Sequence, residues 1–190
     1  MSQAKTLTPQ ELRRVLDYVA TRKHAARNRA MVLMTHWAGM RVGEVAALRI
    51  DDVLDTRGEV RSEVRLDAEQ TKGNHSRVVF VNEKLRKELA KYLALYAPIN
   101  QSQKLFYTQK RMKEGFTANT LCQHFHNLYH AVGIEGASSH SGRRGFLSSL
   151  SEKGVGVRVL MALAGHRNMA TTQRYLDVND NQLRAAAELV

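Results

Sequence analysis

Residues 163–175 read LAGHRNMATTQRY, and the rest of the chain is best interpreted outward from this stretch. An apolar run ends at Gly165 and is followed by His166, several polar and basic residues, and Tyr175. Nothing in the local sequence is suited to burying the tyrosine ring, because Arg167 and Arg174 place cations on both sides of the intervening segment. A tyrosine hydroxyl in such surroundings can act as a nucleophile, whereas the ordinary alternative is an amphipathic tyrosine at a helix edge.

The composition is that of a basic globular protein. The chain has 190 residues, with 29 Lys and Arg against 18 Asp and Glu, a net charge of +11 and a pI near 10.1. A field of this sign attracts polyanions, which favours nucleic acid over an anionic membrane surface. A basic surface that only aids solubility is the alternative. The single Cys122 excludes an internal disulfide framework, and no signal peptide or membrane-length apolar run is found, so a cytoplasmic protein is expected.

Helix-start signals and apolar periodicity predict a mainly α-helical fold with a small antiparallel β-sheet. One helix should begin at Thr8-Pro9, and strands should lie in a β-like segment from about Val53 to Val81, as EVRLDA and RVVFV joined by the turn Lys72-Gly73-Asn74. The other helices are expected over residues 25–38, 43–48, 82–96, 117–132, 140–153, 157–164, around Tyr175, and over 181–190. With two prolines and no linker-like stretch, residues 1–190 are expected to form one domain.

The common nucleotide and metal motifs are missing. The sequence contains no GxxxxGK[ST], GxGxxG, HExxH or CxxC pattern. His126 and His130 lie one helical turn apart, but no carboxylate or cysteine lies nearby in sequence to complete a metal site. A solvated or packed helix face is the better interpretation of this pair, and neither a metal nor another cofactor is expected.

Three further stretches place cations where a phosphate could bind: AGMRVGEVAALR (38–49), TKGNHSR (71–77) and SSHSGRRGF (138–146). Arg41 stands at a helix start, where backbone amides favour anions, and Lys72 stands at the tip of a turn. His140 and Arg143 share one helix face. Each stretch alone is explained equally well by surface cations. However, Arg143 and Arg144 in a first helical turn oppose the helix dipole, and such a local conflict suggests a functional position.

The ordered set Arg, Lys, His-x-x-Arg, Gly-His and Tyr is far more specific than any one stretch. In this order and spacing, the chain resembles the tyrosine recombinases of the phage-integrase type, from about Thr6 to Tyr175. The resemblance implies the catalytic, DNA breaking-and-rejoining fold of that family. It also implies a site-specific recombinase that cuts and rejoins DNA through a covalent 3′-phosphotyrosyl intermediate, in integration, excision or inversion. The alternatives are a catalytically inert DNA-binding accessory or regulator of the same fold, and a topoisomerase-like enzyme.

The resemblance also implies a role for each residue of the set. Two arginines would clamp the scissile phosphate, a lysine would protonate the leaving 5′ hydroxyl, and two histidines would serve the tyrosine proton and the phosphate. An acidic residue would support the site from behind. In the order of these roles, the residues are Arg41 and Arg143, Lys72, His140, His166, the nucleophile Tyr175, and the supporting Glu44. Gly142 and Arg144 depart from the family, which often has leucine and histidine there.

The family further implies double-stranded DNA as the partner and a homo-tetramer that bridges two duplexes. The expected C-terminal helix carries Leu183, Ala186, Ala187 and Val190 on one face, which we expect to dock on a neighbouring protomer. Such recombinases usually carry an N-terminal DNA-gripping domain, whereas here the pattern starts almost at residue 1. The chain is therefore expected to be a catalytic domain without that domain, either part of a longer protein or a naturally short form. A separate DNA-binding protein could replace it.

Overall fold

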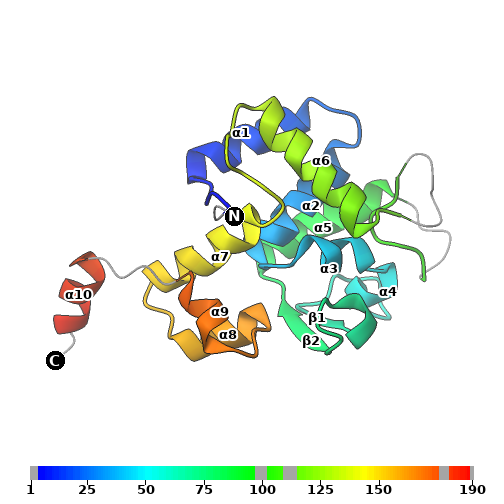
Figure 1. The fold of residues 1–190 in the computed structure, drawn as a ribbon. Coiled ribbons are helices and arrows are strands. Elements are labelled where there is room, and N and C mark those ends of the chain that lie inside the picture. Colours follow the sequence, from blue (N-terminus) through cyan, green and yellow to red (C-terminus); the bar gives the residue numbers. More distant parts are fainter. Residues whose placement is uncertain (1–3, 97–101, 109–114, 176–179, 189–190) are drawn as a thin grey trace.

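The computed structural model describes residues 4–96, 102–108, 115–175 and 180–188. This part of the chain is mainly helical with one two-stranded antiparallel sheet, so the predicted fold class is confirmed (Figure 1). The elements in chain order are α1 Pro9–Ala20, α2 Ala25–Trp37, α3 Val42–Ala47, α4 Ile50–Val53, β1 Glu63–Leu66, the short 3-10 helix η1 Ala68–Gln70, β2 Arg77–Phe80, α5 Glu83–Leu95, α6 Ala118–Ala131, α7 Ser141–Glu152, α8 Val157–Ala164, α9 Met169–Gln173 and α10 Asp180–Ala187.

Helix α2 forms the centre of the main body, where α1, α3, α5 and α7 pack around it (Figure 1). The sequence explains this position, because residues 30–34 are apolar without interruption and leave no polar face for solvent. A helix that is apolar all round needs neighbours on every side. All five of these side chains are fully buried.

Local capping interactions fix the starts of three helices where the sequence predicts them. Thr8 accepts a hydrogen bond from the Glu11 amide (3.2 Å), and the Glu11 carboxylate accepts one from the Thr8 amide (2.9 Å), which completes a capping box. Thr117 and Thr120 form a second capping box at α6, and the Asn82 side chain caps α5 by accepting from the Leu85 amide. Because these bonds satisfy otherwise unpaired amides, each helix begins at its cap.

The β-sheet is much shorter than the predicted β-like segment. Strands β1 and β2 have four residues each and pair antiparallel, with Val64 opposite Val79 in the register. Before them, the Asp52 carboxylate caps α4 by accepting from the Arg49 amide (2.8 Å), and Leu54 and Val60 form only an isolated bridge. The Asp55 carboxylate then organises a turn through two backbone amides. Side-chain caps therefore override the strand pattern in this region.

The C-terminal helices α7, α8 and α9 enclose a second, smaller apolar cluster around Leu147, Leu160 and Ala164, against which Tyr175 packs. The prediction that a short helix carries Tyr175 is wrong, since α9 ends at Gln173. Tyr175 lies in a tighter turn, in which its amide donates to the Thr172 carbonyl (2.9 Å).

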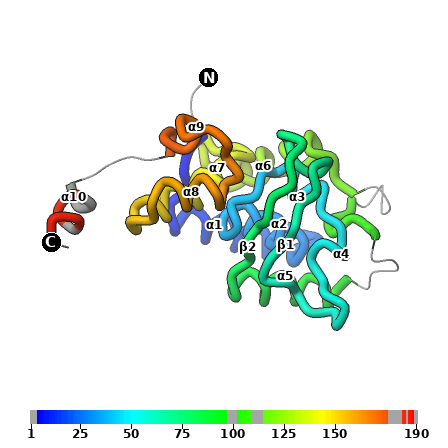
Figure 2. Tube along the Cα trace, turned by 90° about the horizontal axis from the view of Figure 1, so that it is seen from below, coloured from blue at the N-terminus to red at the C-terminus, as the bar shows by residue number. Residues whose placement is uncertain are grey.

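Helix α10 lies apart from the main body in both ribbon and tube views (Figures 1 and 2). It covers Asp180–Ala187, close to the predicted range, and residues 189–190 lie outside the described residues. Leu183 is 59% exposed, and Ala186 and Ala187 are also exposed. Within the described residues, no helix combines the length and the apolarity that crossing a membrane requires.

Candidate active site

Arg41 lies at the junction of α2 and α3, directly before the first residue of α3. Gly39 has a left-handed φ of 61°, and a side chain at this position would overlap the ring of Phe146 on α7. Arg41 caps α3, because its backbone amide donates to Glu44 (2.8 Å) and its guanidinium contacts the same carboxylate (2.9 Å). Gly39 thus allows both the left-handed turn and the close approach of Phe146, and the chain then places Arg41 at the start of α3.

A buried ion pair lies directly behind Arg41. Glu44 is 1% exposed and accepts two bonds from Arg77, at 3.1 Å to Nε and 2.7 Å to Nη2. Burial acts to raise the pKa of the Glu44 carboxyl, but hydrogen bonds and charge from Arg77 and Arg41 outweigh it and lower this pKa below its ordinary value. Glu44 therefore stays ionised and orients both arginines, consistent with the expected supporting position.

Arg77 was not among the predicted site residues, although it joins three elements of the site. Besides Glu44 on α3, its guanidinium binds the Leu163 carbonyl at the end of α8 (2.9 Å), while its own backbone begins β2. The sequence contained a signal that could have identified Arg77 as facing inward. Residues two apart on a strand share a face, so Arg77 lies on the same side as the buried Val79.

Lys72 lies in the turn that connects η1 to β2, and its side chain is exposed. The turn forms one wall of a cavity of about 380 Å3, and the α8–α9 turn forms the opposite wall. Arg41, Lys72, Arg77 and His166 all line this cavity. The hairpin therefore carries Lys72 to the same cavity as Arg41.

Arg143 is the most deeply buried cation of the set, at 3% exposed. Its guanidinium donates to the carbonyls of Gly39 (2.6 Å) and Ala164 (2.5 Å) and contacts Nε2 of His166 (2.9 Å). Burial, followed by the charges of Arg41 and Arg77, lowers the pKa of this guanidinium, which still keeps its proton at neutral pH. The carbonyls explain how a cation is tolerated in the first turn of α7.

Gly142 explains how Arg143 reaches this depth. A side chain at Gly142 would overlap Thr35 of α2, at 2.8 Å from its Cβ, so the glycine allows α7 to approach α2 closely. The departure from the family noted at this position therefore has a packing reason. Arg144, the other departure, lies with its guanidinium carbon 6.0 Å from the centre of the Tyr175 ring.

The protonation of His166 follows from its two hydrogen bonds. An arginine can only donate, so Nε2 of His166 accepts from Arg143, and the proton on Nδ1 is donated to Thr172 Oγ1 (2.9 Å). Burial, then Arg143 and Arg41, lowers the pKa of His166 to about 4, in agreement with a neutral ring. Thr172 is fully buried and was not predicted as a site residue; no local signal marks its contact with His166.

Tyr175 and His140 complete the arrangement beside this cavity. The Tyr175 ring is half-buried and stacks on His166, with centroids 5.8 Å apart and an angle of 21°. His140 precedes α7, is exposed, and lines a second pocket of about 250 Å3 together with Tyr175 and Arg144. Partial removal from water, then the charge of Arg143, lowers the pKa of His140. The fold thus gathers all six predicted residues at one face, where cations dominate.

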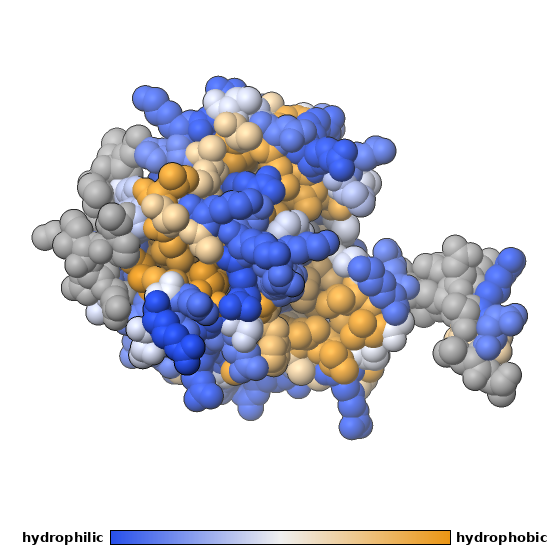
Figure 3. Space-filling model, turned by 180° about the vertical axis from the view of Figure 1, so that it is seen from behind, coloured by the Kyte–Doolittle hydropathy of each residue, from blue (hydrophilic) through white to orange (hydrophobic). Residues whose placement is uncertain are grey.

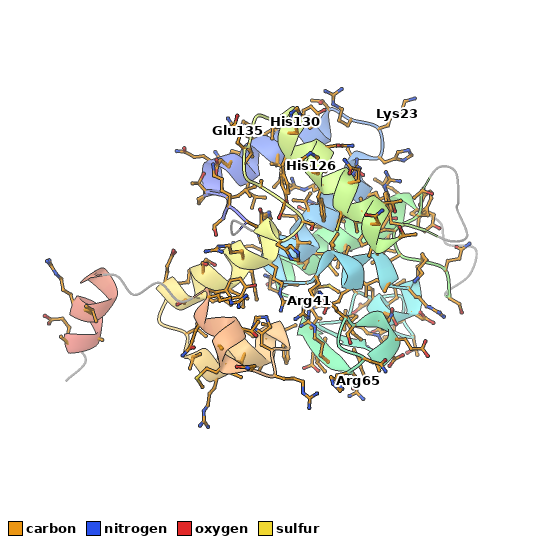
Figure 4. All side chains as sticks on the ribbon, in the orientation of Figure 1. Lys23, Arg41, Arg65, His126, His130 and Glu135 are labelled. Atoms are coloured by element: carbon orange, nitrogen blue, oxygen red, sulfur yellow. The ribbon has the colours of Figure 1, made fainter. Side chains whose placement is uncertain are left out.

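The histidine pair that was considered as a metal site lies away from this cavity. His126 and His130 are exposed on α6, with ring centroids 6.3 Å apart, and Figure 4 shows both far from Arg41. Among the described residues, no group of three or more His, Cys, Asp or Glu side chains is arranged to hold a metal ion. This pair therefore belongs to the surface of α6.

The sequence and the fold are both similar to those of one known protein family. The phage integrase family matches residues 5–182, and the chain belongs to that family. It is 32% identical to the tyrosine recombinase XerA of Thermococcus kodakarensis over 186 residues, 97% of this chain and 62% of that protein. It is 30% identical to the tyrosine recombinase XerD of Rickettsia conorii, over 83% of this chain and 54% of that protein.

Solved structures agree with this assignment. The crystal structure of XerA recombinase matches with a TM-score of 0.77 and 27% identity, over 100% of this chain and 64% of that chain. The catalytic domain of bacteriophage HP1 integrase, at 18% identity, shares the fold with a TM-score of 0.67 over 98% of this chain and 95% of its own length. The present chain spans about three fifths of the length of the XerA relatives that it matches.

Proposed function

We propose that residues 1–190 form the catalytic domain of a site-specific DNA recombinase that cuts and rejoins double-stranded DNA through a phosphotyrosyl intermediate. The observation that carries this proposal is the convergence of Arg41, Arg143 and His166, from α3, α7 and the α8–α9 turn, beside the ring of Tyr175. These are the groups that a phosphodiester and an attacking hydroxyl require, and the basic chain attracts the DNA polyanion.

The two arginines would hold the scissile phosphate. Arg41 lines the cavity with its side chain 26% exposed, whereas Arg143 is buried next to His166 and is held by the carbonyls of Gly39 and Ala164. Guanidinium groups donate paired hydrogen bonds to phosphate oxygens and stabilise the charge that develops in the transition state. Because Glu44 and the carbonyls already fix both side chains, little reorganisation is needed when the phosphate binds.

The reaction would exchange one phosphodiester bond for another. The Tyr175 hydroxyl oxygen attacks phosphorus, its proton passes to His140, and the bond to the 5′ oxygen breaks. Lys72 donates a proton to that leaving oxygen. Since the phosphotyrosyl bond keeps the energy of the broken one, a 5′ hydroxyl can attack it in the reverse direction and reseal the strand.

His166 would bind the phosphate after a change of hydrogen bonding. In this structure its Nε2 accepts from Arg143, so it cannot donate to an anion. The Thr172 hydroxyl can either accept from or donate to Nδ1. When Arg143 turns this N–H from Nε2 to a phosphate oxygen, His166 can carry its proton on Nε2, accept from Thr172 at Nδ1 and donate to the same phosphate.

Covalent trapping tests the proposal. The protein is incubated with nicked duplexes from DNA flanking its own gene, denatured in detergent, and examined for a protein–DNA adduct. We expect an adduct with the wild type and with the control Tyr18→Phe on α1, and none with Tyr175→Phe. An adduct that persists in Tyr175→Phe would assign the nucleophile to another residue. Binding without any adduct would favour the inert accessory protein.

Helix α10 would join protomers in the proposed tetramer. Its Leu183 is 59% exposed, and Figure 3 shows apolar side chains gathered at the end of the body next to α10. These belong to the α7–α8 region, where Val159 is 53% exposed beside the partly buried Leu150 and Val155. A chain ending at Asp180 should still bind one DNA site but fail to assemble; assembly of that shortened chain would refute this role of α10.

A further inference from the structure

The turn that carries Lys72 is a self-contained unit. Thr71 Oγ1 donates to the His75 carbonyl (2.8 Å) and accepts from the His75 amide (3.1 Å), and Asn74 takes the left-handed φ of 51° that closes the turn. Within the part of the chain that the structure describes, the Lys72 ammonium itself makes no hydrogen bond or ion pair. The position of Lys72 therefore depends on how the whole turn is held.

Two contacts connect this turn to the opposite wall of the cavity. At its base, Arg77 binds the Leu163 carbonyl. At its tip, Nη1 of Arg167 lies 2.6 Å from Nε2 of His75. Because arginine only donates, the tip contact requires an unprotonated Nε2 on His75. Arg167 directly follows His166, so the tip contact couples the Lys72 turn to the residue proposed to bind the phosphate.

We propose that His75 and Arg167 form a latch that holds the hairpin turn over the cavity and so positions Lys72 against the leaving oxygen. Both are positioning residues, since neither needs to touch the reacting atoms. The inference rests on the proposed function through the acid role of Lys72. Without the latch, the turn is held at its two bases, by Gln70 and by Arg77, while its tip loses the contact with the α8–α9 turn, and Lys72 spends less time at the leaving oxygen.

The competing explanation is that Arg167 serves only as a DNA cation. Both side chains are exposed at the mouth of the cavity, where a DNA backbone would pass. If Arg167 only contacts DNA, Arg167→Ala should weaken DNA binding, and the effect of His75→Ala should not depend on whether Arg167 is present. The latch predicts that the two residues act as one unit and that their effect appears in protonation of the leaving group.

The first measurement tests the contact without DNA. The nitrogen NMR spectrum of the His75 imidazole in the full chain should show the proton on Nδ1, with Nε2 as acceptor. In Arg167→Ala this tautomer should give way to a mixture, whereas the exposed control Arg158→Ala should leave it unchanged. An identical His75 spectrum in wild type and Arg167→Ala would overturn the latch, whatever the activity.

The second measurement uses the nicked duplex that gives an adduct, in two forms. In one, sulfur replaces the 5′ oxygen at the broken bond, and the thiolate leaves without needing a proton. On the oxygen duplex, His75→Ala and Arg167→Ala should each slow adduct formation about fivefold, as for an exposed charged hydrogen bond. The double variant should be no slower than either single, and His75→Gln, whose amide oxygen can accept the bond, should lose less.

On the sulfur duplex, the latch variants should react at the wild-type rate, as should Lys72→Ala. The exposed control His126→Ala should match wild type on both. Latch variants that stay slow on the sulfur duplex, or whose effects multiply in the double variant, would refute the latch and favour a DNA contact. If Lys72→Ala itself is not rescued by sulfur, the acid role in the proposed function fails, while the His75 spectrum still decides whether the contact exists.

Discussion

Replacing Glu44 by glutamine perturbs the charge that holds two arginines behind the cavity. The carboxylate accepts four bonds, from the Arg41 amide (2.8 Å), Arg41 Nη1 (2.9 Å), Arg77 Nε (3.1 Å) and Arg77 Nη2 (2.7 Å). Glutamine keeps the shape but has one acceptor oxygen, and its NH2 group would face donors. We expect Glu44→Gln to lose at least two of these bonds and to leave Arg77 poorly compensated.

The expected magnitude follows from burial. The side chains of Glu44 and Arg77 are 1% and 9% exposed, and removing one partner of a buried pair costs about 3–5 kcal/mol. Arg41 is 26% exposed and water can replace part of its contact, so we expect the lower end, about 3 kcal/mol. Urea unfolding at pH 7 measures this loss. Glu83→Gln, which removes an exposed pair with Lys87, should change the unfolding free energy by less than about 1 kcal/mol.

The same variant has a defined pH dependence. The pKa of Glu44 is lower in the folded protein than its ordinary value of 4.5, so the unfolded chain binds the proton first as the pH falls. The stabilisation by Glu44 is therefore complete above pH 4.5 and is lost as the pH falls through the folded pKa. The difference in unfolding free energy between wild type and Glu44→Gln should therefore become smaller as the pH falls below 4.5. Equal stabilities at pH 7, or a difference that does not change down to pH 3, would refute this reasoning.

Three further changes have distinct expected results. Gly142→Ala should cost about 1–3 kcal/mol in urea unfolding, because the new Cβ overlaps Thr35; unchanged stability would mean that α7 can shift freely. Thr172→Val removes the hydroxyl that bonds His166 Nδ1, so the ring should no longer hold one tautomer and adduct formation should slow about tenfold. A nitrogen NMR spectrum that shows the same His166 tautomer in the variant would contradict this prediction. Burial lowers the pKa of His36 to about 4, so only the unfolded chain takes up that proton between pH 6.5 and 4. His36 should therefore lower the free energy of unfolding by up to about 1.4 kcal/mol per pH unit as the pH falls through this range, and His36→Phe should remove this share of the slope, while His124 and His166, whose pKa values are also lowered to about 4, keep theirs.

The sequence determined those features that depend on neighbouring residues. Thr8, Asn82 and Thr117 bond to amides within three residues, so the starts of α1, α5 and α6 could be read directly. Gly165, with a φ of 61°, ended α8 where predicted. The ordered motif indicated the family, because the spacing of chemically distinct residues is rarely reproduced by chance. The β-like segment was the exception, since the short-range caps of Asp52 and Asp55 competed with its strand pattern.

Only the tertiary structure decided how the predicted residues are held. Arg77 reaches Glu44 and the Leu163 carbonyl, and Arg143 reaches the Gly39 carbonyl, across separations that no periodicity records. These contacts also show why the motif list was incomplete: it contained the groups proposed to meet the phosphate and the supporting Glu44, but neither Arg77 nor the backbone carbonyls that hold Arg143. Such partners emerge when helices pack, because a buried cation must find acceptors wherever the fold provides them.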